Sequence, residues 1–211
     1  MLTLIGFLIF IYSIILHEIA HGLAAERLGD PTARVSGRLT LNPFPHIDPL
    51  MSIVVPFFLL LSGSPIIFGS AKPVPIDPYN LRNPRKDMGT IGLAGPAANL
   101  LLALCFALIA RFLVSFFPNP SLLKLLGDSA FANIVLAVFN LIPVPPLDGG
   151  RVLVAILPDK YSEALAGVER FGMFLLLFLL FFPTSFFSLP GVISKITNLL
   201  FGLIFPGFPL I

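Results

Sequence analysis

The chain has 211 residues, of which 56% are hydrophobic and 11% charged, and its mean hydropathy is +0.97. Soluble domains are about a quarter charged, so this composition excludes an ordinary water-soluble fold, and the high hydrophobicity excludes a disordered chain. The net charge of +2 comes from 13 Lys and Arg residues that form no concentrated basic stripe, so we expect no nucleic-acid partner. A small polytopic protein of the lipid bilayer remains.

Apolar runs along the chain predict a bundle of membrane helices, because a helix needs about 20 mostly apolar residues to cross a bilayer. The third run is the longest, the second is short, and the fourth is interrupted by prolines and a Gly-Gly pair. In chain order the runs cover residues 2–23, 49–62, 88–117, 129–157, 171–187 and 189–205. We therefore expect an all-α polytopic membrane protein with five to six membrane helices, in which residues 1–211 form one membrane-embedded domain.

Residues 17–21 read HEIAH inside the first run, where each charged group costs about 2.5–3.5 kcal/mol at a helix centre. Positions i and i+4 share one helix face, so His17 and His21 can bind the same metal ion. Glu18 lies about 100° round the helix from His17, within reach of a water on the metal but not as a ligand. This pattern is typical of zinc hydrolases, in which the ion acidifies a water and a carboxylate removes its proton.

A catalytic zinc ion takes three protein ligands and a water, so the histidine pair needs a third ligand. His46 lies in a proline-rich polar loop, and we expect it to be exposed or interfacial. Asp148 follows the proline break in the fourth run, and irregular backbone at membrane depth is tolerated only where protein or a water-filled cavity surrounds it. Asp148 is therefore the better third ligand, with a helix-capping role at the membrane surface as the alternative.

The proline-rich residues 65–87 cannot form a regular helix, and an alternating extended conformation suits them better. If the short run at 49–62 crossed the membrane fully, His21 and Asp148 would approach opposite faces of the bilayer. We therefore expect a short re-entrant or β-like segment between the first and third apolar runs.

Two asparagines lie in apolar surroundings and need hydrogen-bond partners there. Asn99 belongs to GPAAN near the start of the third run, and Asn140 precedes the proline break. Such residues either join helices or donate to a substrate carbonyl or oxyanion. The sequence leaves both readings open.

Three motifs in order resemble the site-2 protease family of intramembrane zinc metalloproteases: HEIAH at 17–21, GPAAN at 95–99 and NLIPVPPLDGG at 140–150. GRLTLNP at 37–43 and AKPVP at 71–75 are similar to its compact prokaryotic branch without PDZ or CBS domains. The resemblance covers about residues 10–155, and C-terminal helices follow at about 165–205. It implies His17, His21 and Asp148 as ligands of one Zn²⁺, Glu18 as general base, and Asn99 and Asn140 as substrate or transition-state contacts.

The resemblance further implies a multi-pass protein of the prokaryotic cell membrane that hydrolyses peptide bonds within or near transmembrane segments of other proteins. The expected partner is thus a transmembrane protein substrate, and an extended edge at residues 66–80 would pair with it by strand addition. The oligomeric state stays open.

Two alternatives remain. In another type of intramembrane zinc peptidase a downstream glutamate is the third ligand, for which Glu163 and Glu169 are the candidates. In the other alternative the chain binds metal without catalysis, as a transporter or as a degenerate protease acting as a chaperone. The presence of Glu18 between the histidines favours activity.

Overall fold

The computed structural model describes residues 2–63, 69–182 and 188–205, and these residues form helices and no strand. The eight α-helices are α1 (Leu2–Arg27), α2 (Thr32–Val35), α3 (Val55–Leu61), α4 (Pro84–Phe116), α5 (Pro120–Asn140), α6 (Asp148–Ile156), α7 (Asp159–Phe181) and α8 (Leu189–Ile204). Short 3₁₀ turns lie at Phe44–His46 and Pro78–Asn80, and a π-helical turn at Pro49–Val54 leads into α3.

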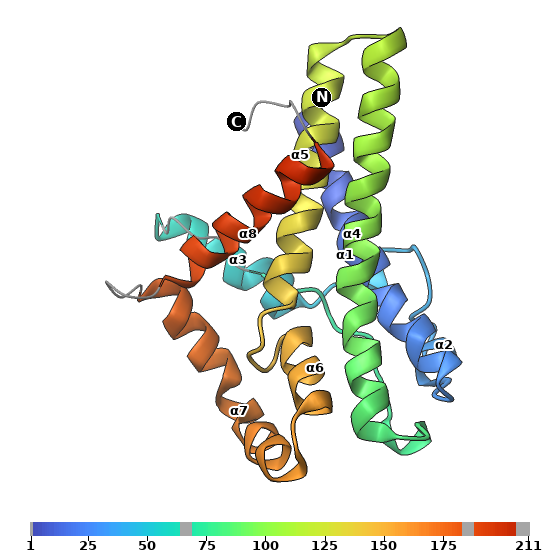
Figure 1. Cartoon of the computed structure of the whole chain (residues 1–211), viewed down its shortest axis with the longest axis vertical. Coiled ribbons are helices and arrows are strands. Elements are labelled where there is room, and N and C mark those ends of the chain that lie inside the picture. Colours follow the sequence, from blue (N-terminus) through green and yellow to red (C-terminus); the bar gives the residue numbers. More distant parts are fainter. Residues whose placement is uncertain (1, 64–68, 183–187, 206–211) are drawn as a thin grey trace.

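Helices α1, α4 and α5 are long and apolar enough to cross a membrane. In Figure 1, α1 and α5 descend from the upper end of the molecule and α4 runs between the same two ends in the opposite direction. The apolar helices Pro49–Leu61, Phe171–Phe181 and Leu189–Ile204 are shorter. Three of the expected five to six membrane helices therefore meet the length requirement among the described residues.

Small side chains bring α4 and α5 together. Ala103, Ala107 and Ala110 of α4 are buried against Ala130, Ile134 and Val138 of α5, and Phe201 of α8 closes the cluster. Lipid tails are as apolar as leucine, so helices in a bilayer associate largely through close packing, which small residues permit. This cluster fixes the frame on which the polar side chains are mounted.

A glycine face on α4 brings α6 equally close. A Cβ added at Gly89 would lie 2.3 Å from the Ala155 Cβ, and one at Gly92 would lie 3.0 Å from the Asp148 carbonyl oxygen. Because residues three apart share a helix face, both glycines accommodate the same neighbour. The start of α6, with Asp148, is thereby held against α4.

Three helices, α5, α6 and α7, have bounds to compare with those expected. The fourth run, residues 129–157, is divided between two helices: α5 begins already at Pro120, where Asn119 caps two backbone N–H groups, and α6 is separate. Helix α7 begins at Asp159, before the apolar run at 171 and before the start of about 165 expected for the C-terminal helices, and residues 183–187 lie outside the described part. Capping residues and prolines set these boundaries, and hydropathy does not register them.

The extended segment at residues 69–77 is not a free strand edge. Three of its N–H groups are already used at 2.8–2.9 Å, with Lys72 bonded to the His46 carbonyl, Val74 to Glu18 Oε2 and Asp77 to Asp30 Oδ2. Pro73 and Pro75 have no N–H to offer. The expected strand addition is therefore not supported over residues 72–77, and residues 66–68 of the expected edge lie outside the described part.

Asp30 ties this segment to the end of α1. Its side chain is fully buried and accepts hydrogen bonds from Thr32 N–H (3.1 Å) and Oγ1, from Asp77 N–H (2.8 Å) and from Asn80 Nδ2 (2.9 Å). Burial raises the pKa of Asp30, but hydrogen bonds from Thr32, Asn80 and backbone N–H groups outweigh it and hold the pKa below 3.8. The ionised carboxylate is thus the form that the fold stabilises.

We predict that Asp30→Asn lowers the free energy of unfolding by about 1–3 kcal/mol, because one buried donor loses its acceptor. Since folding lowers the pKa of Asp30, the stabilisation is present above pH 3.8 and declines as the pH falls below it. Thermal unfolding in detergent between pH 7 and pH 3 measures both effects. Asp128→Asn, at an exposed position of α5, is the control and should retain the wild-type profile.

Candidate active site

His17, His21 and Asp148 meet at one buried point. The two histidines lie one turn apart on α1, and Asp148 is the first residue of α6. Asp148 Oδ2 lies 3.2 Å from Nε2 of each histidine, and the two Nε2 atoms lie 3.0 Å apart. Each of the three residues is at most 7% exposed. They form a group whose ligand atoms all lie within 4.8 Å of one another.

Oxygen acceptors set which nitrogen of each histidine carries the proton. His21 Nδ1 lies 2.7 Å from the Ile91 carbonyl oxygen, and His17 Nδ1 lies 2.9 Å from Asn99 Oδ1. An oxygen acceptor requires a donor, so each Nδ1 is protonated, and in the neutral imidazole Nε2 then has a free lone pair. Both Nε2 lone pairs are directed to the point that Asp148 shares.

The orientation of the Asn99 amide follows from a buried relay that ends on the backbone. Asn133 Nδ2 donates to the Ser129 carbonyl and to Ser13 Oγ, each at 2.9 Å. Its Oδ1 therefore faces Asn99 and accepts from Asn99 Nδ2 at 3.3 Å. Asn99 Oδ1 is left to accept from His17, so a carbonyl of α5 decides the tautomer of a histidine on α1.

The arrangement fits a metal ion. Asp148 Oδ2 is buried and has no hydrogen-bond donor, and it faces two unprotonated nitrogens. Three electron-rich atoms at this distance repel one another unless a cation lies between them. Two imidazole nitrogens and a carboxylate oxygen are a donor set of catalytic zinc sites, which keep a further position for water or substrate.

Gly95 on α4 leaves the room that the imidazoles occupy. A Cβ added there would lie 2.4 Å from His21 Nε2 and 2.5 Å from His17 Cε1. The glycine face of α4 thus accommodates α6 at Gly89 and Gly92 and the histidines at Gly95.

Glu18 lies beside this group without joining it. Its side chain is half-buried, and its Oε2 accepts a hydrogen bond of 2.9 Å from the Val74 N–H. Oε1 has no hydrogen-bond partner among the described residues. Glu18 is thus a carboxylate next in sequence to His17, with one oxygen held by a backbone N–H.

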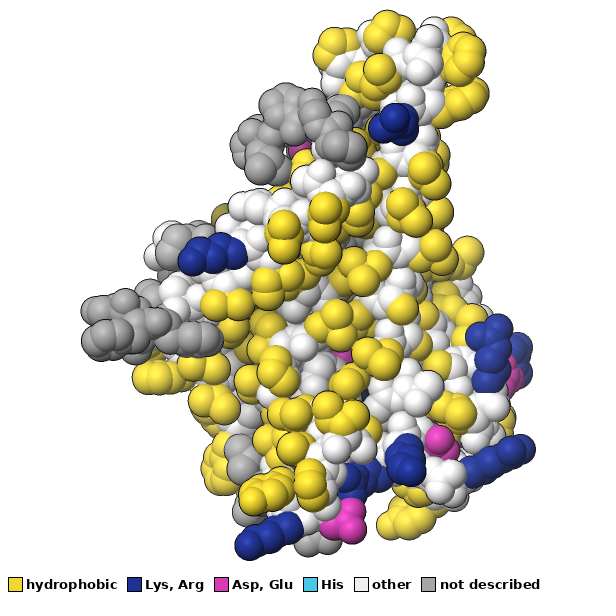
Figure 2. Space-filling view, in the orientation of Figure 1, with side chains coloured by type: hydrophobic (Ala, Val, Ile, Leu, Met, Phe, Trp, Pro, Cys, Tyr) yellow, Lys and Arg dark blue, Asp and Glu magenta, His cyan; other side chains and the backbone are white. Residues whose placement is uncertain are grey.

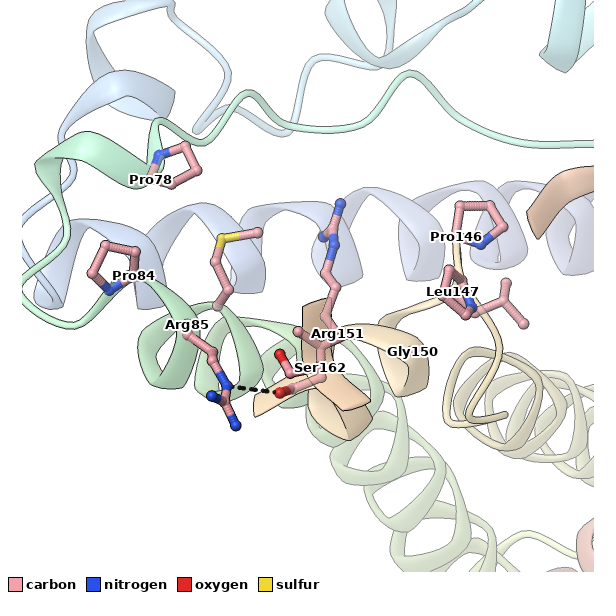
Figure 3. A pocket seen from close by; sticks show the side chains of 11 residues that line it. Pro78, Pro84, Arg85, Pro146, Leu147, Gly150, Arg151 and Ser162 are labelled. Carbon is pink, nitrogen blue, oxygen red and sulfur yellow. Dashed lines mark hydrogen bonds between the residues drawn. The ribbon is translucent and has the colours of Figure 1, made fainter. Parts of the chain in front are cut away.

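A cavity of about 380 Å³ lies beside α6 (Figure 3); Leu147, the neighbour of Asp148, lines it, whereas His17, Glu18, His21 and Asp148 do not. Its wall is mainly apolar, with Met88, Pro146 and Leu147 among the lining residues, and Arg151 enters it from α6. Arg151 Nη1 lies 3.7 Å from Asp148 Oδ1, the oxygen that the histidines do not face. Arg85 closes the far end by donating to the Val154 carbonyl and pairing with Asp159.

Not all residues singled out in the sequence are brought together. Asn140 ends α5 and donates to the Leu136 carbonyl of its own helix, whereas Asn99 contacts His17. His46 is buried and bonded to the Thr40 carbonyl, so its expected exposure is wrong. The side chains of Glu163 and Glu169 are not among those that the structure describes.

Sequence reasoning missed Asn133, Ser13 and Gly95. Asn133 satisfies the same rule that singled out Asn99, because it is an amide in an apolar run, and it could have been found in that way. Gly95 lies in the GPAAN motif, but its spatial role was not foreseen, and Ser13 carries no signal, since small residues are common in membrane helices.

Comparisons with known proteins support this reading. The profile described as Peptidase family M50 matches residues 116–180. "Putative zinc metalloprotease YwhC" of Bacillus subtilis is 34% identical over 187 residues, which cover 85% of this chain and 81% of that protein. "Putative zinc metalloprotease Rip2" of Mycobacterium tuberculosis is 33% identical over 173 residues, with 82% and 64% covered.

"Zinc metalloprotease MJ0392" of Methanocaldococcus jannaschii is 37% identical over 79 residues, which cover 37% of this chain and 22% of that protein. No solved structure matches the chain significantly. Identity above 30% over most of both chains, as with YwhC, establishes a family, and the long apolar helices agree with it. The chain therefore belongs to peptidase family M50, the site-2 proteases, and is a multi-pass membrane protein.

Proposed function

We propose that this member of peptidase family M50 is an intramembrane zinc metalloendopeptidase that hydrolyses peptide bonds within or near transmembrane segments of other proteins. The observation that carries the proposal is the convergence of two histidine nitrogens and one aspartate oxygen beside Glu18, among long apolar helices. The printed names of YwhC, Rip2 and MJ0392 agree with the zinc metalloprotease part of the proposal.

His17, His21 and Asp148 would hold the ion, whose Lewis acidity, when it is bound, polarises the scissile carbonyl and activates water. Glu18 takes a proton from the attacking water at its free oxygen and returns it to the leaving amine. The apolar cavity lined by Leu147, the neighbour of Asp148, offers room for a substrate chain, with Arg151 as a hydrogen-bond donor in its wall. Asn140 remains a candidate for substrate contact.

The placement of the site supports a re-entrant path for residues 28–83. In the structure α1 and α5 run in the same direction, so His21 and Asp148 approach from the same side (Figure 1). Asp30, just beyond α1, is bonded to Asp77 and Asn80, just before α4. The chain thus leaves α1 and enters α4 at the same end of the bundle. In this proposal Pro49–Leu61, α7 and α8 add the shorter membrane-embedded elements.

Charge placement agrees with a site inside a bilayer. The Lys and Arg side chains on the face in Figure 2 gather mainly toward its lower end, over the beginnings of α4 and α7, and hydrophobic side chains cover its middle. A surface of this kind lies against lipid and the transmembrane segments of other proteins, so a transmembrane protein is the substrate class that we propose.

We predict that Glu18→Gln lowers kcat for a model transmembrane substrate by about 10²–10⁴-fold, the usual contribution of a general base, while bound zinc is unchanged. Purified protein in detergent is assayed by gel for cleavage and by atomic absorption for zinc. Glu26→Gln, on the same helix and in an exposed pair with Arg34, is the control. A Glu18→Gln variant as active as wild type would exclude Glu18 as the base, whereas bound zinc with no cleavage by either protein would favour a non-catalytic metal-binding protein.

Gly95→Ala should abolish stoichiometric zinc binding, because the new methyl group would occupy the place of both imidazoles. The matched control is Gly202→Ala on α8, where an added Cβ meets nothing within 4 Å. Zinc is counted per folded protein after gel filtration. Full zinc occupancy in Gly95→Ala would exclude the ligand positions assigned to His17 and His21.

Asn133→Leu should weaken zinc binding about 10–100-fold, the usual effect of losing an outer-shell partner of a metal ligand. The amide sets the His17 tautomer through Asn99, so its loss frees the imidazole to rotate. Competition with a zinc chelator measures the affinity, and Asn198→Leu at an exposed site of α8 is the control. Equal affinities in the two variants would contradict the relay.

A further inference from the structure

Arg38 is a buried cation for which the described residues offer no carboxylate in direct contact. Its side chain is almost fully inside the protein, and its Nε has no hydrogen-bond partner. Its Nη2 donates to the backbone carbonyls of Lys72 (2.6 Å) and Pro73 (3.2 Å). A buried charge without a counter-charge is costly, so the position of this guanidinium requires an explanation.

Glu18 is the negative charge on the other side of a single amide. The carbonyl of Pro73 and the N–H of Val74 belong to the same peptide unit. Arg38 donates to that carbonyl, and that N–H donates to Glu18 Oε2 at 2.9 Å. A hydrogen bond to a carbonyl polarises the peptide and strengthens its N–H as a donor. Arg38 and Glu18 are therefore coupled through one planar group.

The segment that carries this amide is held rigidly. The Lys72 N–H donates to the carbonyl of His46, which is itself buried. Pro73 and Pro75 fix the backbone on either side of Val74 and have no N–H. The Val74 side chain is buried against α1, where a Cβ added at Gly22 would lie 3.1 Å from its Cγ1. Val74 thus presents the only N–H of residues 73–75, and it is aimed at Glu18.

We propose that the Val74 N–H, aimed and polarised by Arg38, is the positioning group of the catalytic base Glu18. It holds Oε2, so that Oε1 is the oxygen available for proton transfer, and it removes rotamers in which Glu18 would turn away. The proposal rests on the proposed function, because it presupposes that Glu18 is the base. Arg38 and Val74 are positioning residues, since they act on the substrate only through Glu18.

Val74→Pro and Val74→Ala separate the N–H from the side chain. Proline keeps the extended backbone but deletes the N–H, whereas alanine keeps the N–H and deletes most of the side chain. We expect Val74→Pro to lower kcat by at least about tenfold, in line with the cost of a misplaced catalytic group, with KM and bound zinc unchanged. Val74→Ala, which keeps the N–H, should lower kcat less than Val74→Pro.

A second readout does not depend on activity. Infrared spectra of metal-free protein are recorded for each variant with and without the additional change Glu18→Gln. The difference between the two spectra isolates the antisymmetric stretch of the Glu18 carboxylate. It should shift in Val74→Pro, which lacks the hydrogen bond, and stay in place in Val74→Ala. Arg38→Met should lower kcat and Arg38→Lys should recover part of it, because lysine restores the charge but not the planar fork. The arginine pair decides the question if Val74→Pro does not fold.

Three results would overturn the proposal: equal kcat in the proline and alanine variants, a rise in kcat in Val74→Pro, or equal kcat in Arg38→Met and Arg38→Lys. A loss of bound zinc that accompanies the fall in kcat would assign the segment a structural role, and this result would overturn the proposal as well. Failure of the proposed function is distinguishable, because Glu18→Gln would then cleave like wild type while the infrared shift still reports the hydrogen bond.

Discussion

A hydrogen-bonding group within the hydrocarbon of a bilayer must find its partner inside the protein, because lipid offers none. The core of this molecule is organised by that requirement. His17, Asn99, Asn133 and Ser13 form one buried chain of hydrogen bonds that crosses from α1 to α4 and α5 and ends on a backbone carbonyl. At its other end the unpaired lone pairs of His17, His21 and Asp148 converge, and a metal ion is the partner that satisfies all three.

Close helix packing makes this convergence geometrically feasible. Alanines bring α5 against α4, and the glycine face of α4 brings both α6 and the histidines of α1 against it. Packing and chemistry depend on the same residues, since larger side chains at Gly92 or Gly95 would separate the ligands. Helices associate in lipid through small residues. In this molecule the same small residues also bring the ligands of the site together.

Outside the helices, the proline-rich segment at residues 69–77 has a role that differs from the one its sequence indicates. Extended backbone with few N–H groups first suggests an edge for a substrate strand, but three of its N–H groups donate to Glu18, His46 and Asp30. The segment is instead a rigid support that joins the loop after α1 to Glu18. Two charges, Arg38 and Glu18, are balanced through it, which accounts for the burial of a guanidinium without a carboxylate in contact.

The sequence by itself determined the membrane class, the long apolar helices and the residue types of the site. These follow from local composition and from the i, i+4 spacing of His17 and His21, which any helix places on one face. The proline break also favoured Asp148 over His46 as the third ligand, and the structure places Asp148 beside the histidines. The structure alone showed Asn99 on an imidazole, Asn133 behind it, and Val74 on Glu18. The proline break correctly separated α5 from α6, but hydropathy failed to place the starts of α5 and α7. The physical reason is that hydropathy and spacing describe neighbours along one helix, whereas these contacts depend on the approach of different helices, which small side chains and single backbone hydrogen bonds control.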